Sequence, residues 1–213
     1  ANGRAVSLGR PDMEISHDGL ASELQIEGQS SFAVHFSDQL RPHAAATLAE
    51  LQALGLTSSI ISGDRAESVA PVAHALGITA QTSMLPQEKL DAIARQKAAG
   101  HKVLMVGDGL NDGPALAAGY ASIAPASASD AGQNAADVVF MGDALTPVAT
   151  AIRAARRTQH IVRQNFILAI GYNVLAVPLA IAGYVTPLIA AAAMSGSSLV
   201  VVANALRLKN AAK

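Results

Sequence analysis

The chain has no cysteine among its 213 residues, which excludes a disulfide framework, a cysteine nucleophile and a cysteine metal site within this stretch. Basic residues are not in excess either. The net charge is -1, so composition does not favour nucleic acid as a partner. The opening residues, ANGRAVSLGRP, contain no initiating Met and lack the basic, apolar and small-residue order of a signal peptide. We therefore expect the chain to begin inside a longer protein.

Charge is absent from residues 164–206, which contain no Asp, Glu, Lys, Arg or His. Such a run is long enough for two membrane-spanning helices, with a turn at GYVTP, residues 183–187. A buried helix pair in a soluble protein is the alternative, but globular helices rarely run this far without a charge. Basic residues flank the run on both sides, so both ends are expected to be cytoplasmic; they are Arg153, Arg156, Arg157, Arg163, Arg207, Lys209 and Lys213.

The region before the apolar run alternates between helical and strand patterns. Residues 1–36 show apolar residues two apart, which predicts part of a small sheet. From residue 37, amphipathic segments closed by glycine alternate with short apolar runs, which predicts an α/β fold with a doubly wound parallel sheet. The predicted helices are 41–55, 64–77 and 86–100, ending at Gly55, Gly77 and Gly100, and the predicted strands include 57–62 and 102–107.

Polar residues follow two of these predicted strands, where ligands bind in parallel sheets. Asp108 and Asp112, with Asn111 between them, offer hard oxygen ligands on a glycine turn, which suits Mg²⁺. The hydroxyl of Ser62 and the neighbouring backbone N–H groups are expected to hold a phosphoryl oxygen, and Lys89 to neutralise a phosphate. Taken singly, each motif also fits an ordinary turn or a solvated charge. Asp64 and Glu67 are interpreted as a helix capping box.

The order SGD, PQEK, GDGLNDGPAL resembles the phosphoryl-transfer domain of the haloacid-dehalogenase type, and the last motif resembles that of the P-type ATPases. The resemblance implies a phosphorylation domain at 37–158, a remnant of a nucleotide-binding domain at 1–36, and two transmembrane helices at 159–213. Two positions depart from the family pattern, Ser62 for the usual Thr and Gly113 for Ala or Ser. The implied catalytic residues are Ser62, Gly63, Asp64, Lys89 and Asn111, and the implied Mg²⁺ ligands are Asp108 and Asp112.

The nucleophile of that family is missing from the chain. P-type ATPases carry a reactive aspartate in an Asp-Lys-Thr-Gly-Thr motif, and no such motif is present here. The resemblance therefore implies that an upstream part of the same ATPase supplies the nucleophile and most of the ATP site. By itself, the chain is predicted to be inactive. The alternatives are a soluble phosphatase of the same fold and a non-catalytic membrane-anchored fragment.

Polar groups interrupt the two apolar helices. Met194 and Ser198 lie four residues apart, hence on one helix face, and a thioether selects Cu(I) over hard cations. The motifs YN, at Tyr172 and Asn173, and MxxSS resemble the copper-type heavy-metal ATPases, most closely those of bacterial haem-copper oxidase assembly. The resemblance implies Cu(I) export across the inner membrane, driven by ATP and Mg²⁺, with membrane lipid and possible delivery by a copper chaperone. Ser195 and Ser197 are interpreted as packing groups.

Overall fold

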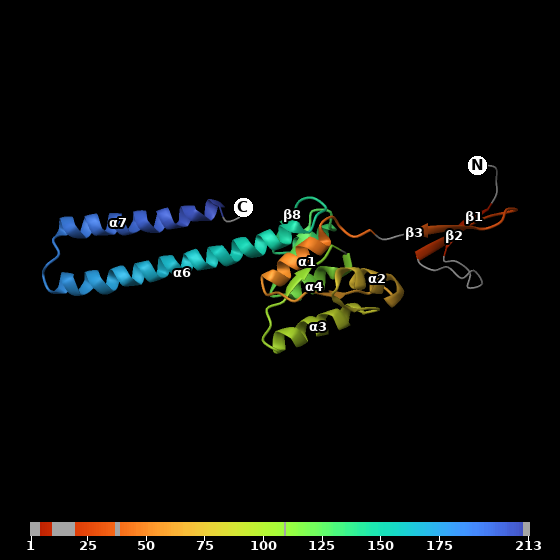
Figure 1. Cartoon of the computed structure of the whole chain (residues 1–213), viewed down its shortest axis with the longest axis horizontal. Helices are drawn as coiled ribbons and strands as arrows, with labels where there is room; N and C mark the ends of the chain where they lie inside the picture. The colour runs from red at the N-terminus through yellow and green to blue at the C-terminus, as the bar shows by residue number, and fades with distance from the viewer. Residues whose placement is uncertain (1–4, 10–19, 37–38, 109, 211–213) are drawn as a thin grey trace. The chain divides into compact units, whose positions relative to one another are not determined.

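The computed structural model describes residues 5–9, 20–36, 39–108 and 110–210. The chain divides into two compact units, Ala1–Leu145 and Thr146–Lys213 (Figure 1). The sequence places a boundary at residue 158, but a single helix, α6 (Thr146–Ile181), continues through that position. The division therefore falls where this helix begins, and each unit is described by itself.

The first strands form the small sheet that the sequence predicts within residues 1–36. The strands β1 (Val6–Gly9), β2 (Leu20–Ile26) and β3 (Phe32–Phe36) pair antiparallel in the order β1-β2-β3. Gly28, with φ at 80°, lies in the turn between β2 and β3, where a left-handed residue is needed. Residues 10–19 of the predicted remnant lie outside the described residues.

Five short strands of the same unit are all parallel, as predicted, but they form two sheets. The first pairs β4 (Ser59–Ile61) with β5 (Thr79–Gln81). The second has the order β6-β7-β8, with β6 (Leu104–Val106), β7 (Ala121–Pro125) and β8 (Val138–Phe140). The intervening helices are α1 (Ala44–Ala53), α2 (Ala66–Leu76), α3 (Pro86–Ala98), α4 (Gly113–Ala118) and α5 (Asp130–Ala135).

Helix ends follow the local signals of the sequence in most cases. Gly77 and Gly100 adopt φ values of 65° and 87°, which close α2 and α3 in the left-handed conformation expected of glycine. Pro86 is the first residue of α3, and the Glu88 carboxylate accepts the Leu85 N–H at 2.7 Å. The capping box predicted for Asp64 and Glu67 is wrong: the residue before α2 is Arg65, which forms no side-chain cap.

A buried cluster joins the helices to both sheets. Ile93 of α3, Met105 of β6 and Leu116 of α4 are each less than a tenth exposed, and Ile61 of β4 packs against them. Burial of such side chains contributes about 1.5–3 kcal/mol each. This cluster lies beneath the carboxyl ends of β4 and β6 and fixes the loops that follow them.

The second unit is a helical hairpin, as the apolar run predicts. Helix α6 is followed by a turn containing Gly183 and then by α7 (Pro187–Leu206) and the short helix η2 (Arg207–Asn210). The two long helices lie side by side (Figure 1). Each contains an 18-residue stretch that is apolar enough to cross a membrane, with a mean hydropathy of 1.5 in α6 and 1.7 in α7. At 1.5 Å per residue, the 20 residues of α7 extend about 30 Å, the thickness of a hydrocarbon core.

Candidate phosphoryl-transfer site

Two loops of the first unit carry the predicted catalytic residues. Ser62 follows β4 directly, and Asp108 comes two residues after β6. Lys89 comes from the first turn of α3, and Asp112 immediately precedes α4. The residues thus come from several different elements, whose packing through the buried cluster brings them to the ends of the strands.

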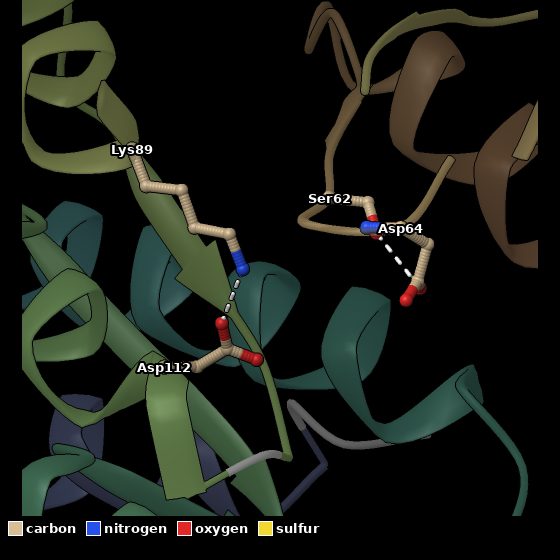
Figure 2. A network of polar contacts seen from close by, with 4 residues as sticks. All are labelled: Ser62, Asp64, Lys89 and Asp112. Carbon is tan, nitrogen blue, oxygen red and sulfur yellow. Dashed lines mark hydrogen bonds and ion pairs between the residues drawn. The ribbon is translucent and has the colours of Figure 1, made fainter. Parts of the chain in front are cut away.

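The loop after β4 holds the Ser62 side chain by its own hydrogen bonds. The Ser62 hydroxyl donates to Oδ2 of Asp64 at 3.0 Å and accepts the Asp64 N–H at 3.1 Å (Figure 2). The Ser62 N–H donates to the Gln81 carbonyl at 2.9 Å and is therefore not free for a ligand. The hydroxyl is thus the group of Ser62 that a ligand could engage, once it leaves Asp64. Gly63 leaves room for the turn, since a Cβ there would lie 3.2 Å from the Met84 carbonyl.

Lys89 and Asp112 form a close ion pair. The ammonium Nζ lies 2.8 Å from Oδ1 of Asp112, and the side chains are only 12% and 19% exposed (Figure 2). Gly107 permits the approach, because a Cβ at that position would lie 3.2 Å from the Asp112 side chain. A lysine held against a carboxylate in a shielded position can offer its remaining donors to a phosphoryl group.

Asp108 has a partner that sequence reasoning missed. Its carboxylate Oδ2 lies 2.7 Å from a guanidinium nitrogen of Arg41, and Arg41 also donates to the Asp143 carbonyl at 3.4 Å. Asp108 remains 56% exposed and Arg41 32% exposed, so the pair is accessible to water and ions. The signal for Arg41 in the sequence is its place at the start of the first predicted helix, which does not identify a partner.

The residues around the η1 turn (Leu110–Asp112) fit Mg²⁺. Mg²⁺ in phosphoryl-transfer sites is bound by one or two carboxylates and by substrate phosphate, and it keeps several waters. Asp108 and Asp112 offer such carboxylates at the two ends of a tight turn, and the exposed Asn111 lies between them. Among the described residues, no group of three His, Cys, Asp or Glu gathers, so these two carboxylates would need phosphate and water to complete the coordination of Mg²⁺. Gly109 of the motif lies outside the described residues.

The predicted metal-pathway residues lie on the two long helices. Asn173 of α6 donates its side-chain N–H to the Ala169 carbonyl at 2.9 Å, which leaves its own oxygen for another partner. Met194 of α7 is 63% exposed, Ser198 lies one turn further on, and Tyr172 is half-buried. Ser197 donates to the Met194 carbonyl at 2.9 Å, a bond within its own helix.

Comparison with known families extends these observations. Residues 1–119 match the model of the haloacid dehalogenase-like hydrolases. The chain belongs to this family. The strands β4, β5 and β6, the Ser62 loop and the Lys89–Asp112 pair all lie within the matched residues.

Similar proteins place the chain more narrowly among P-type ATPases. It is 56% identical over 179 residues to the nitrogen fixation protein FixI of Rhizobium leguminosarum bv. viciae, covering 84% of this chain and 24% of FixI. It is 36% identical over 225 residues to a copper-exporting P-type ATPase of Mycobacterium tuberculosis H37Rv, covering 98% and 30%. The structure matches a crystal structure of a zinc-transporting PIB-type ATPase in its E2.Pi state, with a TM-score of 0.81, 29% identity and coverage of 98% and 36%.

These matches cover both units of the chain. The chain spans about a quarter of the length of FixI, and two of these similar proteins are named as metal-transporting P-type ATPases. Together with the two helices able to cross a membrane, this makes the chain part of an integral membrane protein.

Proposed function

We propose that the chain supplies the Mg²⁺-binding and phosphate-binding half of an ATP-driven pump that exports Cu(I) through an aspartyl-phosphate intermediate. The observation that carries the proposal is the ion pair of Lys89 and Asp112, placed at the strand ends of a phosphoryl-transfer domain whose chain continues into two membrane helices. The soluble domain would lie in the cytoplasm and the helices in the bacterial inner membrane.

Each site residue has a separate task in this proposal. Mg²⁺ would be held by Asp108 and Asp112, and when bound it would neutralise charge on the transferring phosphoryl group. Lys89 adds a fixed positive charge beside the same oxygens. Ser62 can donate its hydroxyl proton to a phosphoryl oxygen by leaving Oδ2 of Asp64, while the Asp64 N–H continues to hold the Ser62 oxygen in position.

The nucleophile would come from an upstream part of the same ATPase. Within the described residues, β4 pairs only with β5 and β6 pairs only with β7, so each strand has an open backbone edge. A strand carrying the reactive aspartate would satisfy those groups and bring its carboxylate to the strand ends, near Ser62 and Asp112. The aspartate would accept the phosphoryl group from ATP, and water would later release it as phosphate.

Copper is favoured as the transported ion by the chemistry of α7. The thioether of Met194 is a soft ligand suited to Cu(I), whereas Zn²⁺ in proteins is bound by nitrogen, oxygen or thiolate. Tyr172, Asn173 and Ser198 would contribute to the same pathway. The relative named as a copper exporter supports this choice, although a zinc transporter shares the fold. A copper chaperone is the expected donor of the ion.

The proposal is tested by comparing two preparations in membranes. We expect the 213-residue chain to need detergent for extraction and to form no phosphoenzyme with ATP. A longer ATPase that contains this chain and an upstream Asp-Lys-Thr-Gly-Thr segment should form one, with turnover stimulated by Cu(I). Recovery of the chain in the aqueous fraction together with hydrolysis of a simple phosphate ester would instead establish the soluble phosphatase. A parent ATPase that forms the phosphoenzyme but responds to Zn²⁺ alone would overturn the choice of copper.

A further inference from the structure

A polar cluster joins α6 and α7 near the open end of the hairpin. The side-chain N–H groups of Asn204 donate to Oδ1 of Asn165 at 2.9 Å and to Oε1 of Gln164 at 3.3 Å. Arg207, at the end of α7, donates to Oδ1 of Asn204 at 3.0 Å. The cluster satisfies the amide of Asn204 and fixes one edge of the Arg207 guanidinium beside the two helices.

A shallow groove of about 390 Å³ runs from this cluster along the helix pair. Its walls change character along its length. At the open end of the hairpin lie Gln164, Asn204 and Arg207, and closer to the turn lie the apolar side chains Ile167, Leu168 and Val200. The apolar side chains are 44–61% exposed, and Arg207 is exposed as well.

Like a phospholipid, the groove is polar at one end and apolar at the other. The apolar residues that follow Gln164 along α6, up to Ile181, span about 25 Å, and α7 spans about 30 Å up to Leu206. A hydrocarbon core of about 30 Å thus places Arg207 and Gln164 at the membrane surface and Ile167, Leu168 and Val200 within the acyl-chain region. A headgroup would meet the polar end of the groove, and an acyl chain would lie along its apolar end.

The charge of the second unit favours a headgroup with net negative charge. Residues 144–213 contain seven basic residues and no Asp or Glu, so the second unit has no acidic side chain to pair with Arg207. In the described part of the chain, the hydrogen bond of Arg207 to Asn204 leaves most of its five N–H donors for a ligand. A guanidinium binds a phosphate oxygen pair well, and a lipid with net negative charge adds a favourable surface potential.

We propose that the groove between α6 and α7 is a binding site for one anionic phospholipid, with Arg207 and Gln164 at the phosphate and Ile167, Leu168 and Val200 along an acyl chain. The proposal rests on the membrane placement of the hairpin and is independent of the phosphoryl-transfer chemistry and of the transported ion. A lipid-binding site of this kind is distinct from the non-specific attraction of basic residues to an anionic membrane surface.

The test uses the full chain in detergent micelles, titrated with phosphatidylglycerol or with phosphatidylcholine of the same acyl chains. Native mass spectrometry counts the bound lipids. We expect one phosphatidylglycerol to bind preferentially, and Arg207→Gln to weaken that binding about fivefold, as expected for the loss of one interfacial charge. Arg163→Gln removes the same charge from an exposed position outside the groove and should change binding by less than about twofold.

A second variant tests the apolar end without altering charge. Val200→Phe should fill part of the groove and weaken phosphatidylglycerol binding, while circular dichroism shows an unchanged helix content. Equal binding of both lipids to the unmodified chain would overturn the proposal. If Arg163→Gln and Arg207→Gln weakened phosphatidylglycerol binding equally, the proposal would also be overturned. Such a result would show non-specific electrostatic attraction and no defined binding site. Failure of the phosphoenzyme assay would leave these lipid measurements unaffected.

Discussion

A guanidinium nitrogen of Arg41 lies 2.7 Å from Oδ2 of Asp108, although the two residues are 67 positions apart in the chain. The carboxylate that we propose as an Mg²⁺ ligand is therefore already paired with a cation of the protein itself. Both side chains are partly exposed, so the pair is weak and exchangeable. A divalent ion bound to Asp108 would have to displace Arg41 or share the carboxylate with it.

This competition predicts that Arg41→Gln tightens binding of a divalent ion. Loss of an exposed ion pair changes an affinity by about twofold to fivefold, and we expect Mn²⁺, used as a spectroscopic substitute for Mg²⁺, to bind more tightly by that factor. Electron paramagnetic resonance of free Mn²⁺ gives the affinity directly in the full chain.

Two control variants accompany this measurement. Arg95→Gln removes a charge from the last turn of α3 and should leave the affinity unchanged. Asp108→Asn should abolish most of the binding, because the amide lacks the charge that holds the ion. Unchanged or weaker Mn²⁺ binding in Arg41→Gln would show that Arg41 does not compete for the carboxylate.

The Lys89–Asp112 pair is predicted to contribute to stability as a unit. Lys89→Met leaves a carboxylate that is 19% exposed without its cation, and we expect the free energy of unfolding to fall by about 1–3 kcal/mol. Asp112→Asn should lower the free energy of unfolding by a similar amount. In the double variant, the free energy of unfolding should fall by much less than the sum of the two single losses, because no unpaired charge remains.

Chemical denaturation of the four proteins in detergent, followed by circular dichroism, gives this coupling free energy. Lys102→Met serves as the control, since Lys102 is exposed and, among the described residues, its ammonium forms no ion pair and lies 5.0 Å from the centroid of the Tyr120 ring. We expect the free energy of unfolding of that variant to fall by less than about 1 kcal/mol. Strictly additive effects of Lys89→Met and Asp112→Asn would contradict the pairing.

Gly119 is predicted to tolerate no side chain. A Cβ there would lie 2.8 Å from the carbonyl oxygen of Ala121, which belongs to β7 and cannot move freely. Gly119→Ala should therefore destabilise the first unit by about 1–3 kcal/mol, as overpacking does. Gly9→Ala adds the same methyl group in β1, where nothing lies within 4 Å. A thermal unfolding midpoint that falls equally in both variants would refute the steric explanation.

Met194→Leu tests the metal pathway in the longer ATPase that contains this chain. Leucine conserves volume and apolarity, so packing should change by less than about 1.5 kcal/mol while the soft sulfur is lost. We expect copper-stimulated ATP hydrolysis and high-affinity Cu(I) binding to disappear. Phosphorylation by inorganic phosphate and Mg²⁺ should persist, because that reaction uses the residues around Asp108.

Ser197→Ala is the matched control for this experiment. The Ser197 hydroxyl bonds the Met194 carbonyl within α7, so its removal should leave copper stimulation nearly intact. Normal copper stimulation in Met194→Leu would remove Met194 from the pathway and would weaken the assignment of copper.

Local features of the fold could be predicted from the sequence because they depend on neighbouring residues. The left-handed glycines after α2 and α3, the proline at the start of α3 and the charge-free run of the hairpin each reflect a short-range preference. The order of the motifs likewise indicated the family, because a run of ten residues specifies one phosphoryl-transfer loop.

The pairing of side chains, in contrast, was decided by tertiary structure. Arg41 meets Asp108, Lys89 meets Asp112 across 23 residues, and Asn204 meets Asn165 across 39 residues. The Ser62 N–H donates to the Gln81 carbonyl because β4 pairs with β5, two strands that are separated in the chain by α2. No local pattern encodes these contacts, because each depends on how separate elements pack and on which buried polar group still needs a partner.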